Sequence, residues 1–293
     1  RSLDQHLTFN KAVDFFSKRK VEFGRTQMRS LHLIGEEGMY TNLAFLLSEQ
    51  CTHMIKLAVF EGSKKSVFRD RQELSGSLLN QMKEAFNYID RYNRTRAEFS
   101  GLDRLDMRDY PTEAIREALL NAIVHRDYSF SGATLISIFE DRIEFVTIGG
   151  LVKGIALDDV MLGVSALRNQ HLANIFYRLR LIEAYGTGIL KIKECYDDYV
   201  VKPVIETTSN AFKVTLPNTN FHAEEQKVQN ILRTGGTTNA KKKEERINTV
   251  LELCRSKGFI VRSDVEMELG VSQSTAILLL RELTDEGVLI KKG

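Results

Sequence analysis

Apolar residues recur every three or four positions in several stretches of the chain, which is the spacing of helices that bury one face. The best-marked stretch is 110–128, where Pro111 and Thr112 indicate a helix start. Five apolar residues follow there at helical spacing: Ile115, Ala118, Leu119, Ala122 and Ile123. The same period predicts helices over 8–20, with Thr8 as the N-cap, and over 41–49, 72–92, 169–181 and 189–195.

Other stretches alternate apolar and polar residues, which predicts strands. Residues 54–60 form one such stretch, 133–139 and 142–147 indicate a hairpin, and 203–207 with 212–216 indicate a second hairpin. Residues 93–109 indicate an exposed connection. The chain up to residue 217 therefore predicts an α/β (α+β) fold, a mixed sheet with helices on one face, whose core covers about 101–217.

The last quarter of the chain has a different pattern. Residues 218–245 contain a Thr/Gly/Asn run at 234–239 and three consecutive lysines at 241–243, which predicts a flexible linker. From residue 246 the pattern predicts a helix to 257, a second helix over 263–269, a turn at Gly270 and a third helix over 272–286. A strand is expected to begin at 288–290. This order is typical of a winged helix-turn-helix with a truncated wing.

Composition narrows the classes of protein that fit. A chain of 293 residues with 43% hydrophobic residues can bury the cores of two or three domains. Its apolar runs are all shorter than the roughly 18 to 20 residues of a membrane span, and its three cysteines are widely separated, which favours a reducing, cytoplasmic setting. The start at Arg1, without an initiator Met, indicates a fragment of a longer protein.

The helix predicted at 110–128 carries a polar stripe beside its apolar face. Glu117 and Asn121 stand four residues apart, so both side chains project from the same strip of the helix. One interpretation is an ordinary amphipathic helix with a solvated polar side. The other is a site for ATP and Mg²⁺, because magnesium prefers hard oxygen ligands and a carboxylate one turn away can position a water.

Four segments in order resemble the divergent GHKL-type (histidine-kinase-like) ATPase domain of Schlafen-related transcriptional regulators. They are EALLNAIVHRDY at 117–128, the hairpin that ends in Ile-Gly-Gly-Leu at 148–151, Ser-Ala-Leu-Arg-Asn at 165–169, and Gly-Thr-Gly-Ile at 186–189. Residues 31–47 resemble the region that precedes this domain in those proteins. An AlbA-type domain normally lies upstream there, and the chain contains no P-loop of the kind that a helicase motor uses.

The resemblance implies a role for each matching residue. Glu117 would be the carboxylate that orients a water, and Asn121 would place its amide oxygen on the magnesium ion. The resemblance implies at most a slow Mg²⁺-dependent ATPase. The other nucleotide-binding candidates are Arg126, Thr147, Gly149, Gly150, Arg168, Asn169, Gly186, Thr187 and Gly188.

The chain departs from the family pattern at the position that reads adenine. GHKL ATPases have an Asp there and the divergent relatives tend to have Asn-Pro-Gly-Gly, whereas this chain has Thr147 and Ile148 before its two glycines. A threonine still forms hydrogen bonds, but it is shorter and less discriminating. A second departure is Gln170, where the relatives have Pro.

In the winged helix-turn-helix, the residues that open the third helix are the expected DNA-binding residues. They are Ser272, Gln273, Ser274 and Thr275. Residues 246–293 contain seven Lys/Arg and seven Asp/Glu, so this unit is near neutral, and a dimer is expected to bind double-stranded DNA better than a single copy. A winged helix that binds proteins remains an alternative.

Three functions therefore fit the sequence. The first is a nucleotide-responsive transcriptional regulator that binds DNA. The second is an ATPase-like scaffold that binds partner proteins and no nucleotide. The third is an accessory region of a nucleic-acid-processing enzyme whose active site lies upstream.

Overall fold

A computed structural model of the chain describes residues 1–100, 103–183, 186–221, 247, 249–255, 257–271, 273–285 and 289. The chain divides into two compact units, residues 1–223 and 224–293. No helix among the described residues combines the length and the apolar character that a membrane crossing requires.

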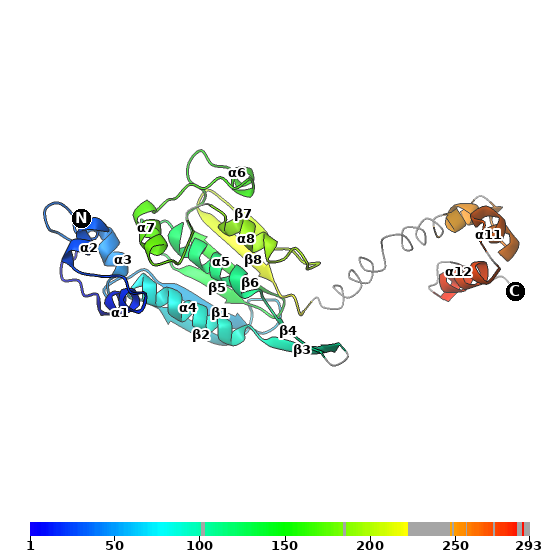
Figure 1. The fold of residues 1–293 in the computed structure, drawn as a ribbon, viewed down its shortest axis with the longest axis horizontal. Helices are drawn as coiled ribbons and strands as arrows, with labels where there is room; N and C mark the ends of the chain where they lie inside the picture. Colours follow the sequence, from blue (N-terminus) through cyan, green and yellow to red (C-terminus); the bar gives the residue numbers. More distant parts are fainter. Residues whose placement is uncertain are drawn as a thin grey trace. The chain divides into compact units, whose positions relative to one another are not determined.

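The first unit is built on a six-stranded sheet with the strand order β2-β1-β5-β6-β8-β7 (Figure 1). The strands are β1 (Ile55–Phe60), β2 (Phe68–Leu74), β5 (Thr134–Ile138), β6 (Arg142–Ile148), β7 (Val204–Thr207) and β8 (Ala211–Pro217). Strands β1 and β5 are parallel, and the other neighbours are antiparallel. Because parallel neighbours need a crossover connection, the chain between them includes α4 (Leu78–Tyr92) and α5 (Thr112–Val124).

Helices α4 and α5 lie side by side against one face of this sheet (Figure 1). On that face a row of buried side chains runs across four strands in register: Leu57, Ile136, Phe145 and Val214. These residues belong to the same hydrophobic core as the buried faces of α4 and α5. The predicted fold class, a mixed α/β sheet with helices on one face, is confirmed.

The remaining helices of the first unit lie around this layer. They are α1 (Asn10–Lys18), α2 (Arg25–Ser30), α3 (Asn42–Leu47), α6 (Leu157–Met161), α7 (Gln170–Arg178) and α8 (Gly188–Glu194). Thr8 does not cap α1 as predicted. The N-cap position is Phe9, and the Thr8 backbone N–H donates to Gln50 Oε1 at 2.9 Å. Thr41, in contrast, accepts a hydrogen bond from the Ala44 N–H at the start of α3.

Two predicted boundaries are wrong. Residues 72–74 belong to β2 and not to the helix, because they pair in register with β1, and Leu74 is buried opposite Ile55. Residues 93–109 are not a simple connection, since they form an antiparallel hairpin of β3 (Thr95–Ser100) and β4 (Asp103–Arg108), separate from the main sheet. Both strands alternate apolar and polar residues, at 96–100 and at 104–108, but the many charged residues there indicated an exposed connection instead.

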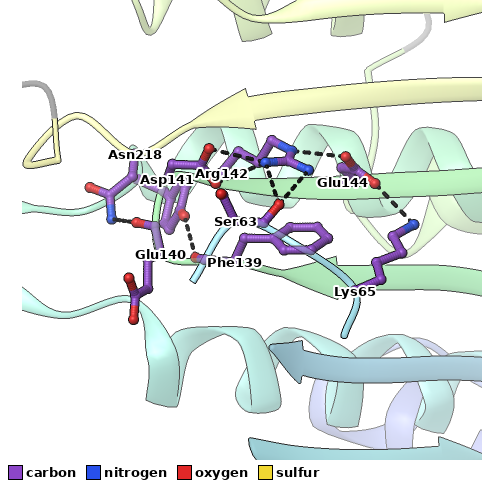
Figure 2. Close-up of polar contacts among 9 residues, drawn as sticks. Ser63, Lys65, Phe139, Glu140, Asp141, Arg142, Glu144 and Asn218 are labelled. Atoms are coloured by element: carbon purple, nitrogen blue, oxygen red, sulfur yellow. Dashed lines mark hydrogen bonds and ion pairs between the residues drawn. The ribbon is translucent and has the colours of Figure 1, made fainter. Parts of the chain in front are cut away.

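On the other face of the sheet, the β1–β2 connection covers part of β6 (Figure 2). Lys65 Nζ lies 3.2 Å from Glu144 Oε2, and Arg142 Nε donates to Glu144 Oε1 at 2.8 Å. Arg142 also donates to the Ser63 carbonyl at 3.3 Å. Glu144 is only 8% exposed, so this connection buries a carboxylate between two cations.

The ordered packing of the first unit continues past Pro217, into the start of the predicted linker. Asn218 is buried and donates through Nδ2 to the Glu140 carbonyl at 2.8 Å (Figure 2). The Thr219 N–H donates to the Asp109 carbonyl at 2.8 Å. These contacts hold the chain where it leaves the sheet, whereas residues 222–246 lie outside the described residues.

The second unit contains the helix pair that the sequence predicts. Helix α11 (Arg262–Leu269) ends at Gly270, and α12 (Gln273–Asp285) follows. Residues 249–255 are also helical. Five buried side chains form the core of this unit: Val250, Val265, Ala276, Leu279 and Leu283. Most of the predicted wing strand at 288–290 lies outside the described residues.

The ion pairs that Glu144 makes with Arg142 and Lys65 can be tested by mutation. Burial alone would raise the pKa of Glu144, but hydrogen bonds from Arg142 and Lys65 outweigh burial and hold the pKa below its ordinary value of 4.5. A carboxyl with a depressed pKa stabilises the fold above that ordinary value, and the contribution is lost as the pH falls through the folded-state pKa. Glu144→Gln should therefore lower the free energy of unfolding by about 1–2 kcal/mol at pH 7.

Urea unfolding of both proteins across a pH series would measure this difference. The gap should be complete at neutral pH and should shrink below pH 4.5. Glu73→Gln is the matched control, because Glu73 pairs with Lys56 at 2.8 Å but is 61% exposed, and it should change stability by less than about 0.5 kcal/mol. A Glu144→Gln gap that stays constant down to strongly acid pH would contradict the assigned ion pairs.

Candidate nucleotide site

The first unit contains a cavity of about 400 Å³ between α5, α7, α8 and the loops that follow β6. Eight of the eleven residues predicted to handle nucleotide line this cavity: Glu117, Asn121, Gly149, Gly150, Arg168, Gly186, Thr187 and Gly188. The rest of the wall is mainly apolar, with Leu120, Val124, Ile155 and Val160 among its residues. A largely apolar cavity with a few polar groups is typical of small-molecule sites.

Helix α5 is buried on nearly every side, including its polar stripe. Its first turn follows Pro111, and Glu113 in that turn is exposed. One turn later Glu117 is 7% exposed, although it is a carboxylate. The interpretation of 110–128 as an amphipathic helix with a solvated polar side is therefore wrong for Glu117, which faces the cavity.

The charge of Glu117 is controlled by its neighbours. Burial raises the pKa of the Glu117 carboxyl, and the nearby charges of Arg116 and Lys191 oppose that rise. Arg116 donates both to Glu117 Oε1 and to the Leu181 carbonyl. A buried carboxylate held by an arginine, with its pKa above the ordinary value, suits the acceptance of a proton from water.

Asn121 lies one turn further along the same strip. Its Nδ2 donates to the Glu117 backbone carbonyl at 2.8 Å, which fixes the orientation of the amide and leaves Oδ1 as its acceptor. An amide oxygen is a suitable Mg²⁺ ligand, and magnesium bound to nucleotide takes most of its other oxygens from water and phosphate. Within the described parts of the chain, no three His, Cys, Asp or Glu side chains gather into a metal cluster of their own.

Gly188 explains how α8 reaches these two side chains. A Cβ at residue 188 would lie 2.8 Å from Asn121 Nδ2 and 3.2 Å from Glu117 Oε2. Any side chain at this position would therefore displace both groups. The first residue of α8 must be glycine for the helix to lie directly against the Glu117–Asn121 strip.

The end of β6 lies close against the residues that follow α5, and Gly149 allows this approach as Gly188 does for α8. Gly149 has φ +102°, and a Cβ there would lie 2.9 Å from Asp127 Cβ. Arg168 Nη1 lies 3.2 Å from Asp127 Oδ2, and Arg168 Nη2 donates to the Gly150 carbonyl at 2.9 Å. Arg168 therefore lines the cavity and is paired with a carboxylate, and its contact with nucleotide stays a prediction.

Arg126 does not line the cavity. Its guanidinium is 2% exposed and donates to the backbone carbonyls of Met54 (3.2 Å), Phe130 (3.3 Å) and Gly132, and it lies 3.4 Å from Thr134 Oγ1. The predicted contact with phosphate is replaced by a structural one. The guanidinium joins the start of β5 to the segment that precedes β1.

Thr147 and Asn169 are also committed to the protein interior, and neither lines the cavity. The Thr147 hydroxyl donates to the Ala122 carbonyl of α5 at 3.0 Å. Asn169 Nδ2 donates to the carbonyls of Val124 and Arg126 at 2.8 and 2.7 Å. Both residues tie neighbouring elements to α5 through these hydrogen bonds.

Several further polar residues, none of them predicted from the sequence, line the cavity: His125, Ser165, Asn174, Glu183 and Lys191. His125 could have been found, because it continues the Glu117–Asn121 strip by four more residues. Lys191 could have been found in the same way, because it follows Thr187 by four residues. It lies 2.8 Å from Glu183 Oε2, across the end of the cavity that holds Glu117. Glu183 has no spacing signal in the sequence.

The predicted DNA-binding residues stand at the start of α12. Gln273 is the first residue of the helix and is exposed, and Thr275 is half-buried. Ser272 lies outside the described residues, and the side chain of Ser274 is not described. Their contact with DNA stays a prediction.

Comparison with known proteins shows that part of the chain matches a family model. Residues 133–216 match the family model described as "Putative ATP-dependent DNA helicase recG C-terminal". The chain contains an ATPase-like domain. The match covers β5 to β8, and the cavity is formed between this ATPase-like domain and α5, which immediately precedes it.

Among solved structures, the chain is similar to the DIP2311 protein from Corynebacterium diphtheriae, with a TM-score of 0.65 and 22% sequence identity. The alignment covers 93% of this chain and 56% of that protein, so the chain spans little more than half its length. At this identity the likeness concerns the fold. No curated protein matches the chain at a significant level.

The structural role of Arg126 can be tested by mutation. Arg126→Met should lower the free energy of unfolding by at least about 2 kcal/mol, because it leaves buried carbonyls without donors. Chemical denaturation measures this, with Arg178→Met on the exposed end of α7 as the control. Unchanged stability of Arg126→Met would contradict the assigned structural role.

Proposed function

We propose that the first unit binds ATP with Mg²⁺ in the cavity beside α5, and that bound nucleotide controls DNA binding by the second unit. The observation that carries the proposal is the Glu117–Asn121 strip, a buried carboxylate and an oriented amide that line the cavity together. The ATPase-like family match and the predicted resemblance support it from the sequence.

The chemistry of each side chain suits its proposed role. Asn121 Oδ1 would coordinate a magnesium ion that bridges phosphate oxygens, and the bound ion would supply charge neutralisation for the phosphates. Glu117 would accept a proton from the attacking water. Lys191 would stabilise phosphate charge by exchanging its partner Glu183 for the ligand.

A scaffold that binds no nucleotide is the second candidate, and a specific observation favours it. Thr147, the residue predicted to meet adenine, uses its hydroxyl within the protein. In addition, Arg168 and Lys191 are both paired with carboxylates. An accessory role in a nucleic-acid-processing enzyme is a third candidate, and the match to the family model described as "Putative ATP-dependent DNA helicase recG C-terminal" favours it.

A calorimetric titration with ATP, with and without Mg²⁺, separates the first two candidates. Asn121→Ala should remove the Mg²⁺-dependent part of ATP affinity while the fold stays intact. Glu117→Gln should keep ATP affinity within about threefold and abolish slow hydrolysis, because the amide cannot take the proton. Glu113→Gln, one turn earlier and exposed, is the matched control and should change neither property.

Hydrolysis by the unmodified protein should also depend on pH in a defined direction. The reaction needs Glu117 ionised, and burial raises the pKa of this carboxyl above 4.5. The rate should therefore fall on the acid side at a higher pH than an exposed glutamate would give. The scaffold interpretation replaces the proposal if the unmodified protein shows no ATP affinity with Mg²⁺.

For the second unit we propose double-stranded DNA as the ligand, bound with the start of α12 in a groove. The exposed Gln273 at the first position of α12 supports this. Replacing both Gln273 and Thr275 by Ala should weaken specific binding about tenfold or more. Neutralising Lys241, Lys242 and Lys243 should mainly reduce the salt dependence.

Fluorescence anisotropy with labelled duplexes at several salt concentrations would measure both effects. Glu268→Gln, on the exposed side of α11, is the control for the first. Two copies are expected to bind more tightly than one, so affinity should rise with protein concentration in the dimerising range. A complete lack of DNA affinity at low salt would favour a protein-binding role for this unit.

A further inference from the structure

His125 is the third polar residue on the strip of α5 that lines the cavity. It follows Asn121 by four residues, as Asn121 follows Glu117, and its backbone N–H donates to the Asn121 carbonyl at 3.0 Å. The three side chains therefore lie in a row along the cavity: a carboxylate, an amide and an imidazole. Of the three, only Glu117 and Asn121 have a role in the proposed function.

The two ends of this row have different surroundings. Gly188 approaches Asn121 and Glu117 at one end, and Lys191 acts electrostatically on Glu117 there. At the other end His125 shares the cavity wall with the glycine pair and Arg168. If magnesium and phosphates bind at Asn121, the base of the nucleotide extends along the cavity towards one of its other walls.

The imidazole of His125 is available to a ligand. Among the described residues its ring makes no hydrogen bond with the protein, and it still lines the cavity. Burial, and then the nearby charge of Arg168, lower the pKa of His125. At pH 7 the ring is therefore neutral, with one nitrogen that donates and one that accepts.

Thr147 cannot supply a base-reading group in this arrangement. Its hydroxyl donates to the Ala122 carbonyl on the inner side of α5 and lies 3.4 Å from Thr134 Oγ1. It is 2% exposed and does not line the cavity. A base in the cavity would instead meet the ring of His125.

We propose that His125 is the base-contacting residue of the site and hydrogen-bonds the edge of a purine base whose phosphates and Mg²⁺ lie at Asn121. This inference rests on the proposed function, because it places the base of the same nucleotide. A neutral imidazole offers one donor and one acceptor, so it can meet the amino group of adenine or the carbonyl oxygen of guanine. The site should therefore accept both ATP and GTP, with affinities within about tenfold of each other.

Calorimetry with three probes, each with Mg²⁺, tests the assignment: ATP, GTP and inorganic tripolyphosphate, which has no base. The unmodified protein should bind ATP more tightly than tripolyphosphate. His125→Leu should weaken ATP and GTP binding about tenfold, the value of one neutral hydrogen bond, and leave tripolyphosphate affinity unchanged. His125→Gln keeps a donor and an acceptor and should retain most of the affinity for ATP.

His171→Leu is the matched control, because His171 is an exposed histidine on α7 that does not line the cavity. It should leave the affinity for all three probes unchanged. A purely structural role for His125 would weaken tripolyphosphate binding along with ATP, and that result would overturn the inference.

The remaining outcomes separate this inference from the function on which it rests. If His125→Leu keeps the full advantage of ATP over tripolyphosphate, the base lies elsewhere, and the inference is wrong while nucleotide binding stands. If the unmodified protein binds none of the three probes, the proposed function fails, and the inference fails with it.

Discussion

The burial of α5 is the constraint on which the first unit depends. This helix packs against the sheet on one side and against α4 and α8 on others, so eight apolar residues of α5 are buried: Ala114, Ile115, Ala118, Leu119, Leu120, Ala122, Ile123 and Val124. A polar side chain on such a helix has little access to bulk water and needs a partner from the protein or from a ligand. Glu117 has Arg116, and Asn121 has the Glu117 carbonyl, but both also line a cavity.

The neighbours of α5 are positioned by side chains that sequence reasoning assigned to a ligand. Thr147 joins β6 to the last turn of α5, and Asn169 joins the start of α7 to the last residue of α5. Arg126 joins the residues after α5 to Met54, just before β1. Because these three residues hold the neighbouring elements against α5, they help to determine where the cavity lies, although none of them lines it.

This division explains how much could be predicted. Helical and alternating patterns located α5, the β5–β6 hairpin and the sheet class correctly, since burial of one face produces a period in the sequence. The period does not indicate whether a polar residue beside that face points to a ligand or to a backbone carbonyl. Arg126 and Arg168 are both arginines within the resembling segments, yet only Arg168 reaches the cavity.

The spacing of polar residues predicted which residues line the cavity better than residue type did. Glu117 and Asn121 follow from the four-residue interval, and the same interval continues to His125. Glu183 could not have been predicted, because it belongs to a loop and reaches the cavity only through the fold. The β3–β4 hairpin was missed although its strands alternate apolar and polar residues, because its many charged residues indicated an exposed connection and it lies apart from the main sheet.

The charges around the cavity indicate what kind of ligand fits. Arg116, Arg168 and Lys191 are paired with Glu117, Asp127 and Glu183 respectively. A free polyanion would therefore gain a cation only by displacing a carboxylate, a small cost for Glu183, which is 61% exposed, and a larger one for the buried Glu117. A nucleotide that arrives with Mg²⁺ brings most of its own neutralising charge and needs few cations from the wall. Under the proposed function, the paired charges thus favour a metal-bound nucleotide over a bare phosphate compound, with the amide of Asn121 as the ligand of the metal.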